Sequence, residues 1–440
     1  MGITDQRPQR HHRRPRGRRR LARQITALVV ALSIGTAALS YTHALTYPGN
    51  ASWQVRTVEW VRDHGGTGLV NAVENWWFAH NVPTGIAPPA SSLPSVDSAS
   101  ITATAAQLPH LPLLPGVAPL PGEGSWVPGA QRTGGVPALY TGWFRPDPAY
   151  PSQIVGTAWI DQSVTVTRLI AGTKEPGGTG SRDNAQVPPG LRSTLVAALN
   201  SGWKMKDITG GYYAAGREVV PLRDGAASLA IDTAGHVSVG RWSRDLRMGP
   251  QIAAVRQNLD LIIDRGRPVP GLADNSSGAW GSAKNQFQYT WRSGIGTDRT
   301  GNLIYIGGDK LTLTGLAHAM VAAGVQTGME LDIHPGMVTF NVFHPAPDAP
   351  FGLAATRLLP DMPQPATRYL SPDQRDFFAV TLRGPDGPGA NASAPLIAGA
   401  ALDSGPAGTT APGPGRCTAR PQAVLPPFYL PLARWVPAHS

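Results

Sequence analysis

The longest apolar stretch of the chain lies near its N-terminus. Residues 25–45 contain no Asp, Glu, Lys or Arg and consist mainly of Ala, Leu, Val and Ile. A helix rises about 1.5 Å per residue, so about 20 residues cross the hydrocarbon core of a bilayer. Residues 1–24 carry nine arginines, and a basic flank stays on the cytoplasmic side. The pattern predicts a basic cytoplasmic tail (1–24), a single transmembrane signal-anchor (25–45) in the cell membrane, and an extracellular C-terminal part.

A cleavable signal peptide is the competing interpretation of the same stretch. Thr42-His43-Ala44 is an acceptable cleavage site, and Arg19-Arg20 can be read as a twin-arginine pair. The apolar run, however, is longer than the usual signal core of roughly 7–15 residues. This length favours a retained anchor, and both interpretations export the rest of the chain.

The basic tail also explains the charge of the protein. Residues 1–23 hold nine arginines against one acid, Asp5, and so account for +8 of the formal net charge of +10. The remainder is close to neutral, which argues against nucleic acid as a partner. A polybasic segment beside a membrane helix instead suits anionic lipid head groups.

Two helical patterns follow the anchor within residues 46–82. Trp53–His64 and Leu69–His80 are separated by Gly65-Gly66 and are dense in tryptophan. Tryptophan favours the headgroup zone of a bilayer, so one interpretation is a segment that lies at the membrane surface. The other is that these helices pack on the main domain, and the sequence leaves both open.

Composition divides the rest of the chain. Residues 83–137 are rich in Pro, Ser, Ala and Gly and show no sustained period, which predicts a linker. Residues 384–440 have the same character and predict a Pro/Gly-rich disordered tail. It holds the single cysteine, Cys417, so an intramolecular disulfide is excluded and the domain at 138–383 needs an ordinary core. Abundant Ala, Gly, Pro and Arg with little Lys is typical of a high-GC bacterium such as an actinobacterium.

Within 138–383, strand patterns alternate with two helical ones. The helices are expected at Leu191–Leu199 and from a cap at Thr314 to Gly324. A hairpin is expected where Ser228–Asp232 and His236–Trp242 flank a Gly-containing turn. Further strands are expected at Gln153–Ile160, Val164–Ile170, Leu303–Ile306, Val325–Ile333 and Met337–Phe343. The fold class is therefore α+β, a mixed sheet with flanking helices preceded by one transmembrane helix.

One of these strands carries candidate chemistry. Side chains alternate across a strand, so Glu330, Asp332 and His334 are expected on one face and Met329, Leu331 and Ile333 on the other, toward the core. Two acids and an imidazole in a row suit acid–base catalysis or a divalent cation. Ordinary charges on a solvated face are the simpler alternative, and spacing alone favours it.

The order of several short motifs narrows this choice. Asn200-Ser-Gly-Trp is followed by a hairpin, then by Arg292-Ser-Gly-Ile-Gly and a strand. A helix opening Leu-Thr-Leu-Thr-Gly-Leu-Ala and then Leu331-Asp332 complete the series. This order resembles the phosphodiester glycosidase domain family, which includes the lysosomal uncovering enzyme that removes N-acetylglucosamine from a sugar phosphodiester. The resemblance is good over Leu191–Phe343 and weaker back to Tyr140.

Carried over position by position, the resemblance implies a site. Asn200, Gly202, Arg292, Gly296 and Asp332 match the family pattern. The resemblance then implies a hydrolase of the cell envelope that cleaves a sugar-1-phosphodiester in a wall polymer or glycolipid. Arg292 would neutralise the phosphate, Asn200 would orient the sugar, and Asp332, with Glu330, would act as acid/base or hold a metal.

The sequence also departs from the family. Ser201 replaces a glycine, Trp203-Lys204 replaces an aromatic pair and Gly294 replaces alanine, while Ile333-His334-Pro335-Gly336 replaces a Gly-Gly-Gly-Ser loop. Glycines allow a close ligand approach and positive φ, which isoleucine and proline do not. One hypothesis is that His334 supplies what the loop has lost. Another is a degenerate domain that binds an anionic wall polymer without cleaving it, and a third is a structural envelope protein that presents its tail to a partner.

Overall fold

The computed structural model describes residues 16–47, 51–94, 108–130, 132–133, 135–177, 185–282 and 286–384. The chain forms two units, one of residues 1–47 with 52–67 and one of residues 48–51 with 68–440. The basic tail up to residue 15 and the Pro/Gly-rich tail from 385 therefore lie outside the described residues.

The first unit contains the N-terminal helix α1 (Arg16–Thr46). Its Arg23–Thr46 stretch is long and apolar enough to cross a membrane and is not buried by the protein, which fits an anchor or a signal sequence. Helix α2 (Trp53–Val61) and the π-helical turn η1 (Arg62–Gly66) follow. Trp60 lies edge-on to Tyr41 at 5.2 Å and donates from Nε1 to Ser40 Oγ. These contacts hold α2 against the end of α1.

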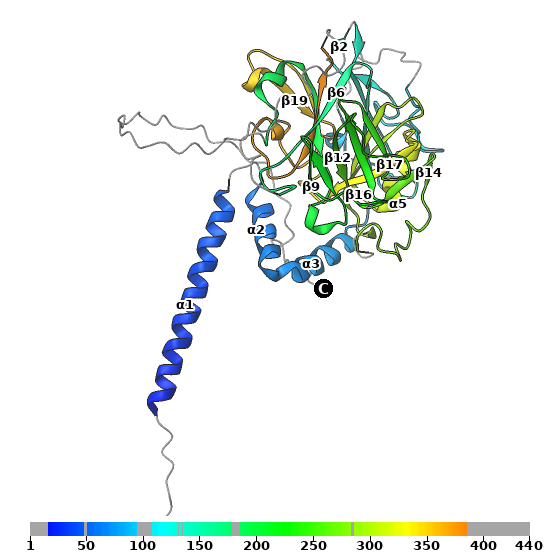
Figure 1. Ribbon diagram of the computed structural model, residues 1–440. Helices are drawn as coiled ribbons and strands as arrows, with labels where there is room; N and C mark the ends of the chain where they lie inside the picture. The colour runs from blue at the N-terminus through cyan, green and yellow to red at the C-terminus, as the bar shows by residue number, and fades with distance from the viewer. Residues whose placement is uncertain are drawn as a thin grey trace, which may run out of the picture. The chain divides into compact units, whose positions relative to one another are not determined.

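The second unit contains helix α3 (Thr67–His80, from Gly68 on) and is built mainly from antiparallel sheets (Figure 1). The largest sheet has eight strands, in the spatial order β1 (Val127–Pro128), β4 (Leu139–Phe144), β5 (Val155–Ile160), β16 (Leu303–Leu311), β15 (Thr290–Thr297), β17 (Thr327–Ile333), β13 (Leu261–Asp264) and β14 (Arg267–Pro268).

Two five-stranded sheets complete the fold. One has the order β11 (Val237–Arg241), β10 (Ala227–Asp232), β12 (Ile252–Gln257), β8 (Tyr212–Ala214) and β9 (Arg217–Val220). The other has the order β19 (Leu353–Arg357), β18 (Phe340–Pro345), β7 (Leu195–Asn200), β20 (Phe377–Leu382) and β6 (Thr165–Ile170). A short pair, β2 (Arg132–Thr133) and β3 (Val136–Pro137), stands apart.

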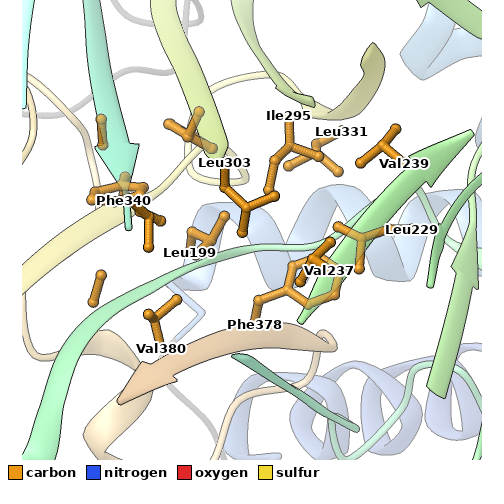
Figure 2. Packing of buried hydrophobic residues seen from close by; sticks show 14 of the residues in the cluster. Leu199, Leu229, Val237, Val239, Ile295, Leu303, Leu331, Phe340, Phe378 and Val380 are labelled. Carbon is orange, nitrogen blue, oxygen red and sulfur yellow. The ribbon is translucent and has the colours of Figure 1, made fainter. Parts of the chain in front are cut away.

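The core lies where the three sheets meet (Figure 2). One buried cluster draws Ile295 and Leu331 from the first sheet, Leu229 from the second, and Leu199 and Phe378 from the third. The opposite face of the eight-stranded sheet is covered by α5 (Leu313–Ala322), whose apolar residues pack in a second cluster with strands β13 and β16.

The fold class predicted from the sequence is confirmed, as are the hairpin of β10 with β11 and helix α5. The cap of α5 is Thr312, whose Oγ1 accepts from Gly315 N, rather than Thr314. The helix expected at Leu191–Leu199 is wrong, because Pro189–Thr194 is a 3-10 turn and β7 follows it. This strand pairs on both edges and is buried on both faces, and periodicity alone does not separate such a strand from a buried helix.

The segment assigned to a linker also differs where it is described. Leu111 and Leu114 are buried, and β1 extends the large sheet. Arg145 forms a buried ion pair with Glu123, with 2.8 Å between Nη2 and Oε2. Residues 108–130 are therefore part of the folded unit, although proline and glycine keep them from forming long strands.

Candidate functional site

The candidate site is built around Asp332, near the end of β17. The register of β15 with β17 shifts between Arg292 and Gly294, and the extra residue on β17 makes a bulge. Asp332 N donates to Ser201 O at 3.0 Å, which ties the bulge to the end of β7. The carboxylate accepts from Arg375 Nη2 at 2.7 Å and from Ile333 N at 3.0 Å. The Asp332 side chain is 12% exposed, so it is largely shielded from solvent.

The bulge interrupts the alternation expected along this strand. Glu330 and Ile333 pair opposite Gly294 and Arg292 on β15, so Asp332 does not continue the row that Glu330 begins. Ile333 packs instead in the cluster beneath α5. The expectation that Glu330, Asp332 and His334 form one polar face is therefore wrong. Among the described residues, no three His, Cys, Asp or Glu side chains are grouped as metal ligands.

Glu330 is fully buried in an ion pair with Arg292, and both are 0% exposed. Arg292 Nη1 lies 2.6 Å from Glu330 Oε1, and Arg292 Nε donates to Leu311 O at 2.8 Å. Gln286 Oε1 accepts a further bond from Nη1. The guanidinium is thus committed to the protein interior. This corrects the expectation that Arg292 faces a ligand.

Asn200 is brought to the site, but its amide is used by the protein. Its Oδ1 accepts from Tyr305 OH and Thr339 N, and its Nδ2 donates to Ser293 Oγ. Ser293 Oγ in turn donates to Asp332 O at 2.8 Å. Asn200 and Asp332 are therefore linked through one hydroxyl, and Asn200 fixes the backbone that presents the carboxylate.

The two matched glycines serve close packing. A Cβ on Gly202 would lie 2.9 Å from Asn258 Cγ, and one on Gly296 would lie 2.3 Å from Thr327 O. The carbonyl of Gly202 accepts from Arg375 Nη2 at 2.9 Å. Next to it, the buried Ser201 Oγ has no hydrogen-bond partner among the described residues.

His334 lies beyond the strand, at φ +78°. Its ring stacks on Phe78 of α3 with centroids 5.4 Å apart, and its Nδ1 is 3.4 Å from Thr290 Oγ1. Gly336 also has positive φ, and its carbonyl accepts from Arg368 Nη1 at 2.9 Å. The loop after Asp332 therefore keeps left-handed positions in spite of Ile333 and Pro335, and the protein packs around it.

The cations near Asp332, namely Arg375, Lys204 and Arg256, were not among the site residues predicted from the sequence. Arg375 pairs with Asp332, and its neighbour Asp376 holds Arg256 with 2.8 Å between Oδ2 and Nε. Asp373, just before them, holds Arg368 at 2.7 Å. The charged run of residues 373–376 was a visible signal, but it follows the region of resemblance and reaches Asp332 only through the fold.

These contacts oppose the effect of burial on the two acids. Burial raises the pKa of Asp332, while Arg375, the Ile333 amide, Lys204 and Arg256 favour its ionised form. Burial raises the pKa of Glu330 to about 7, against the influence of Arg292, and the nearby charge of Asp332 adds to the rise. A carboxyl with a raised pKa can exchange protons near neutral pH, as a general acid or base must.

The match to a protein-family model agrees with the motif order. Residues 193–332 match the family model described as phosphodiester glycosidase, which confirms the resemblance. No curated protein matches the chain. The catalytic domain of zebrafish N-acetylglucosamine-1-phosphodiester alpha-N-acetylglucosaminidase, auto-inhibited by its pro-peptide, is similar at 15% identity, TM-score 0.37, over 59% of this chain and 88% of that one.

Two further solved structures are similar. A hypothetical protein from Synechocystis has 13% identity and a TM-score of 0.33, and the aligned part covers 57% of this chain and 63% of the Synechocystis chain. A putative exported protein from Burkholderia pseudomallei has 11% identity and a TM-score of 0.31, and the aligned part covers 53% of this chain and 74% of the Burkholderia chain. The family match includes Asn200, Arg292 and Asp332 and ends before Arg375.

Proposed function

We propose that this chain, which carries a phosphodiester glycosidase-like region, is a hydrolase of sugar-1-phosphodiesters in the cell envelope. Helix α1 would anchor it in the cell membrane with the N-terminus in the cytoplasm and the second unit outside. The observation that carries the proposal is the side chain of Asp332, which lies in the family-matched part of the chain, is 12% exposed and pairs with Arg375.

The chemistry would centre on Asp332. Water attacks the anomeric carbon, the bond from that carbon to the phosphate oxygen breaks, and the products are the free sugar and a phosphomonoester. As general base, Asp332 takes the proton of the attacking water. The positive charges of Arg375 and Lys204 both favour the ionised form of Asp332, so these two cations are close enough to the carboxylate to bind the phosphate of the substrate.

The other matched residues would act by positioning. Arg292 and Glu330 support the strand pair from inside, and Asn200 holds the backbone of Asp332 through Ser293. Arg292 and Glu330 are 0% exposed and Asn200 is 4% exposed, so we assign these three residues a supporting role rather than contact with the substrate. We therefore propose Arg375 and Lys204, rather than Arg292, as the residues that bind the phosphate.

A second candidate is a binding module that holds an anionic wall polymer without cleaving it. The observation in its favour is the packed loop after Asp332, where Ile333 is 2% exposed and His334 lies against Phe78. Such a loop leaves less room for a reacting sugar than a glycine-rich one.

The test uses the full chain in detergent micelles with activated sugar phosphodiesters as substrates. We expect turnover in the parent, a loss of about 10²–10⁴-fold in Asp332→Asn, and no loss in Asp274→Asn, a matched change at an exposed acid. Absence of turnover in the parent at every pH would refute the hydrolase. Polymer binding that survives Asp332→Asn but fails in Arg375→Met would then identify the binding module.

A further inference from the structure

Helix α3 presents an apolar face to solvent. Leu69 is 68% exposed, Val73 is 42% exposed and Trp76 is 61% exposed. Ala72 and His80 are exposed as well. The positions 69, 72, 73, 76 and 80 follow helical spacing, so they form one stripe, which we call the outer α3 face. It contains no Asp, Glu, Lys or Arg.

The opposite side of α3 packs on the rest of the second unit. Phe78 is buried and stacks on His334, and Phe78 O accepts from Tyr289 N at 3.3 Å. Asn75 forms a side-chain hydrogen bond with Gln288. A helix of a soluble domain normally turns its apolar stripe inward, whereas α3 is attached partly through polar contacts and leaves most of its apolar stripe outside.

We propose that the outer α3 face docks on the surface of the lipid bilayer. An exposed apolar stripe of this kind marks an interaction surface, and the course of the chain identifies the occupant. The apolar helix α1 ends at Thr46, so only residues 47–68 separate a membrane-spanning segment from Leu69. Fully extended, that segment reaches at most about 80 Å, and the helical turns of α2 within it shorten the reach considerably.

The side chains of the outer α3 face suit the interfacial layer. Tryptophan places an apolar ring with a polar N–H at the level of the head groups, and leucine and valine enter the acyl boundary. Because the face carries no charged residue, binding needs no anionic lipid and is insensitive to salt. Both interpretations of the tryptophan-rich segment then hold for α3, which packs on the protein by one side and on the bilayer by the other.

Docking has a consequence for the proposed function, on which this step rests. Phe78 contacts His334, two residues beyond Asp332, so the α3 side of the candidate site would face the head groups. The substrate class would then be a sugar phosphodiester attached to a membrane lipid. A soluble phosphodiester would be cleaved equally well by docked and undocked protein.

The test places a fluorescent probe on the outer α3 face of the full chain in phosphatidylcholine vesicles. In a Cys417→Ser background, which removes the single cysteine, Val73→Cys and Leu69→Cys are labelled with an environment-sensitive dye. Val219→Cys on β9 is the matched control, because Val219 is also exposed, at 38%. We expect a blue shift, with quenching by lipids spin-labelled near the head group, at 73 and 69 but not at 219, unchanged by added salt.

Quenching at 73 and 69 no stronger than at 219 would overturn the proposal. A blue shift without lipid quenching, lost when the protein is diluted among more vesicles, would assign the face to a second copy of the chain and overturn it too. The measurement does not depend on turnover. A protein that docks but does not cleave would refute only the proposed function.

Discussion

Replacement of Arg292 tests whether this matched arginine is a buried structural partner or a ligand group. Arg292→Met removes the guanidinium that lies 2.6 Å from Glu330 while leaving Glu330 fully buried. Breaking a buried ion pair from one side costs about 3–5 kcal/mol of the free energy of unfolding. Leu311 O and Gln286 Oε1 lose a donor as well.

The loss of free energy of unfolding should depend on pH, because Glu330 can become neutral by taking up a proton. Burial already raises the pKa of Glu330 to about 7, and loss of Arg292 raises it further. At about pH 5 Glu330 is protonated in both the parent and the variant, so the substitution lowers the free energy of unfolding less. At about pH 8 the variant must bury either an unpaired carboxylate or a proton taken up at unfavourable pH, so the loss is larger. The double variant Arg292→Met/Glu330→Leu should recover most of the loss, since replacing both partners by apolar groups is often neutral.

The assay is denaturant unfolding of the full chain in micelles, followed by tryptophan fluorescence at both pH values. Arg244→Met is the matched control, because Arg244 pairs with Asp245 and Asp264 at the surface and its side chain is 42% exposed. Such surface pairs contribute about 0–1 kcal/mol. The reasoning is refuted if Arg292→Met costs no more than Arg244→Met, or costs the same at both pH values.

Three further outcomes follow from the site and its supports. Arg375→Met should raise the pKa of Asp332 and move the acid limb of the rate profile up by about 1–3 pH units, while Arg375→Lys should not; an unmoved limb in the methionine variant contradicts the pairing. Gly296→Ala should lower the free energy of unfolding by about 3 kcal/mol, since a Cβ would lie 2.3 Å from Thr327 O. Gly190→Ala should be neutral, because nothing lies within 4 Å of a Cβ there, and equal melting temperatures of the two variants would contradict the close packing at Gly296. The folded state keeps a proton on Glu330 that the unfolded state releases, so stability should fall as pH rises from 4.5 to about 7; calorimetry of Glu330→Gln should show a flatter dependence, and equal slopes would disprove the assignment.

Elements with a strong local signal were predictable from the sequence. The apolar run of α1, the hairpin of β10 with β11 and helix α5 are each set by a contiguous period or a turn. The motif order was equally readable and identified Asn200, Arg292 and Asp332. Backbone packing explains two matched glycines, since Gly202 and Gly296 leave no space for a Cβ.

What the tertiary structure decided depends on contacts between distant segments. Strand β7 reads as a helix because its pairing partners β18 and β20 come far later in the chain, and its two faces are buried in separate core clusters. The proline-rich residues 108–130 read as a linker because they have no period of their own, and their burial comes from distant partners such as Arg145, which pairs with Glu123.

The candidate site shows the same division between sequence and fold. The sequence by itself determined which residues are present and in what order, and it identified Asp332. One extra residue in β17 turned Asp332 away from the row of Glu330, and Arg292 went into the interior with Glu330. Arg375 reached the carboxylate from beyond the matched region. Side-chain direction after a bulge and the pairing of remote charges are set by three-dimensional packing, which no local pattern encodes.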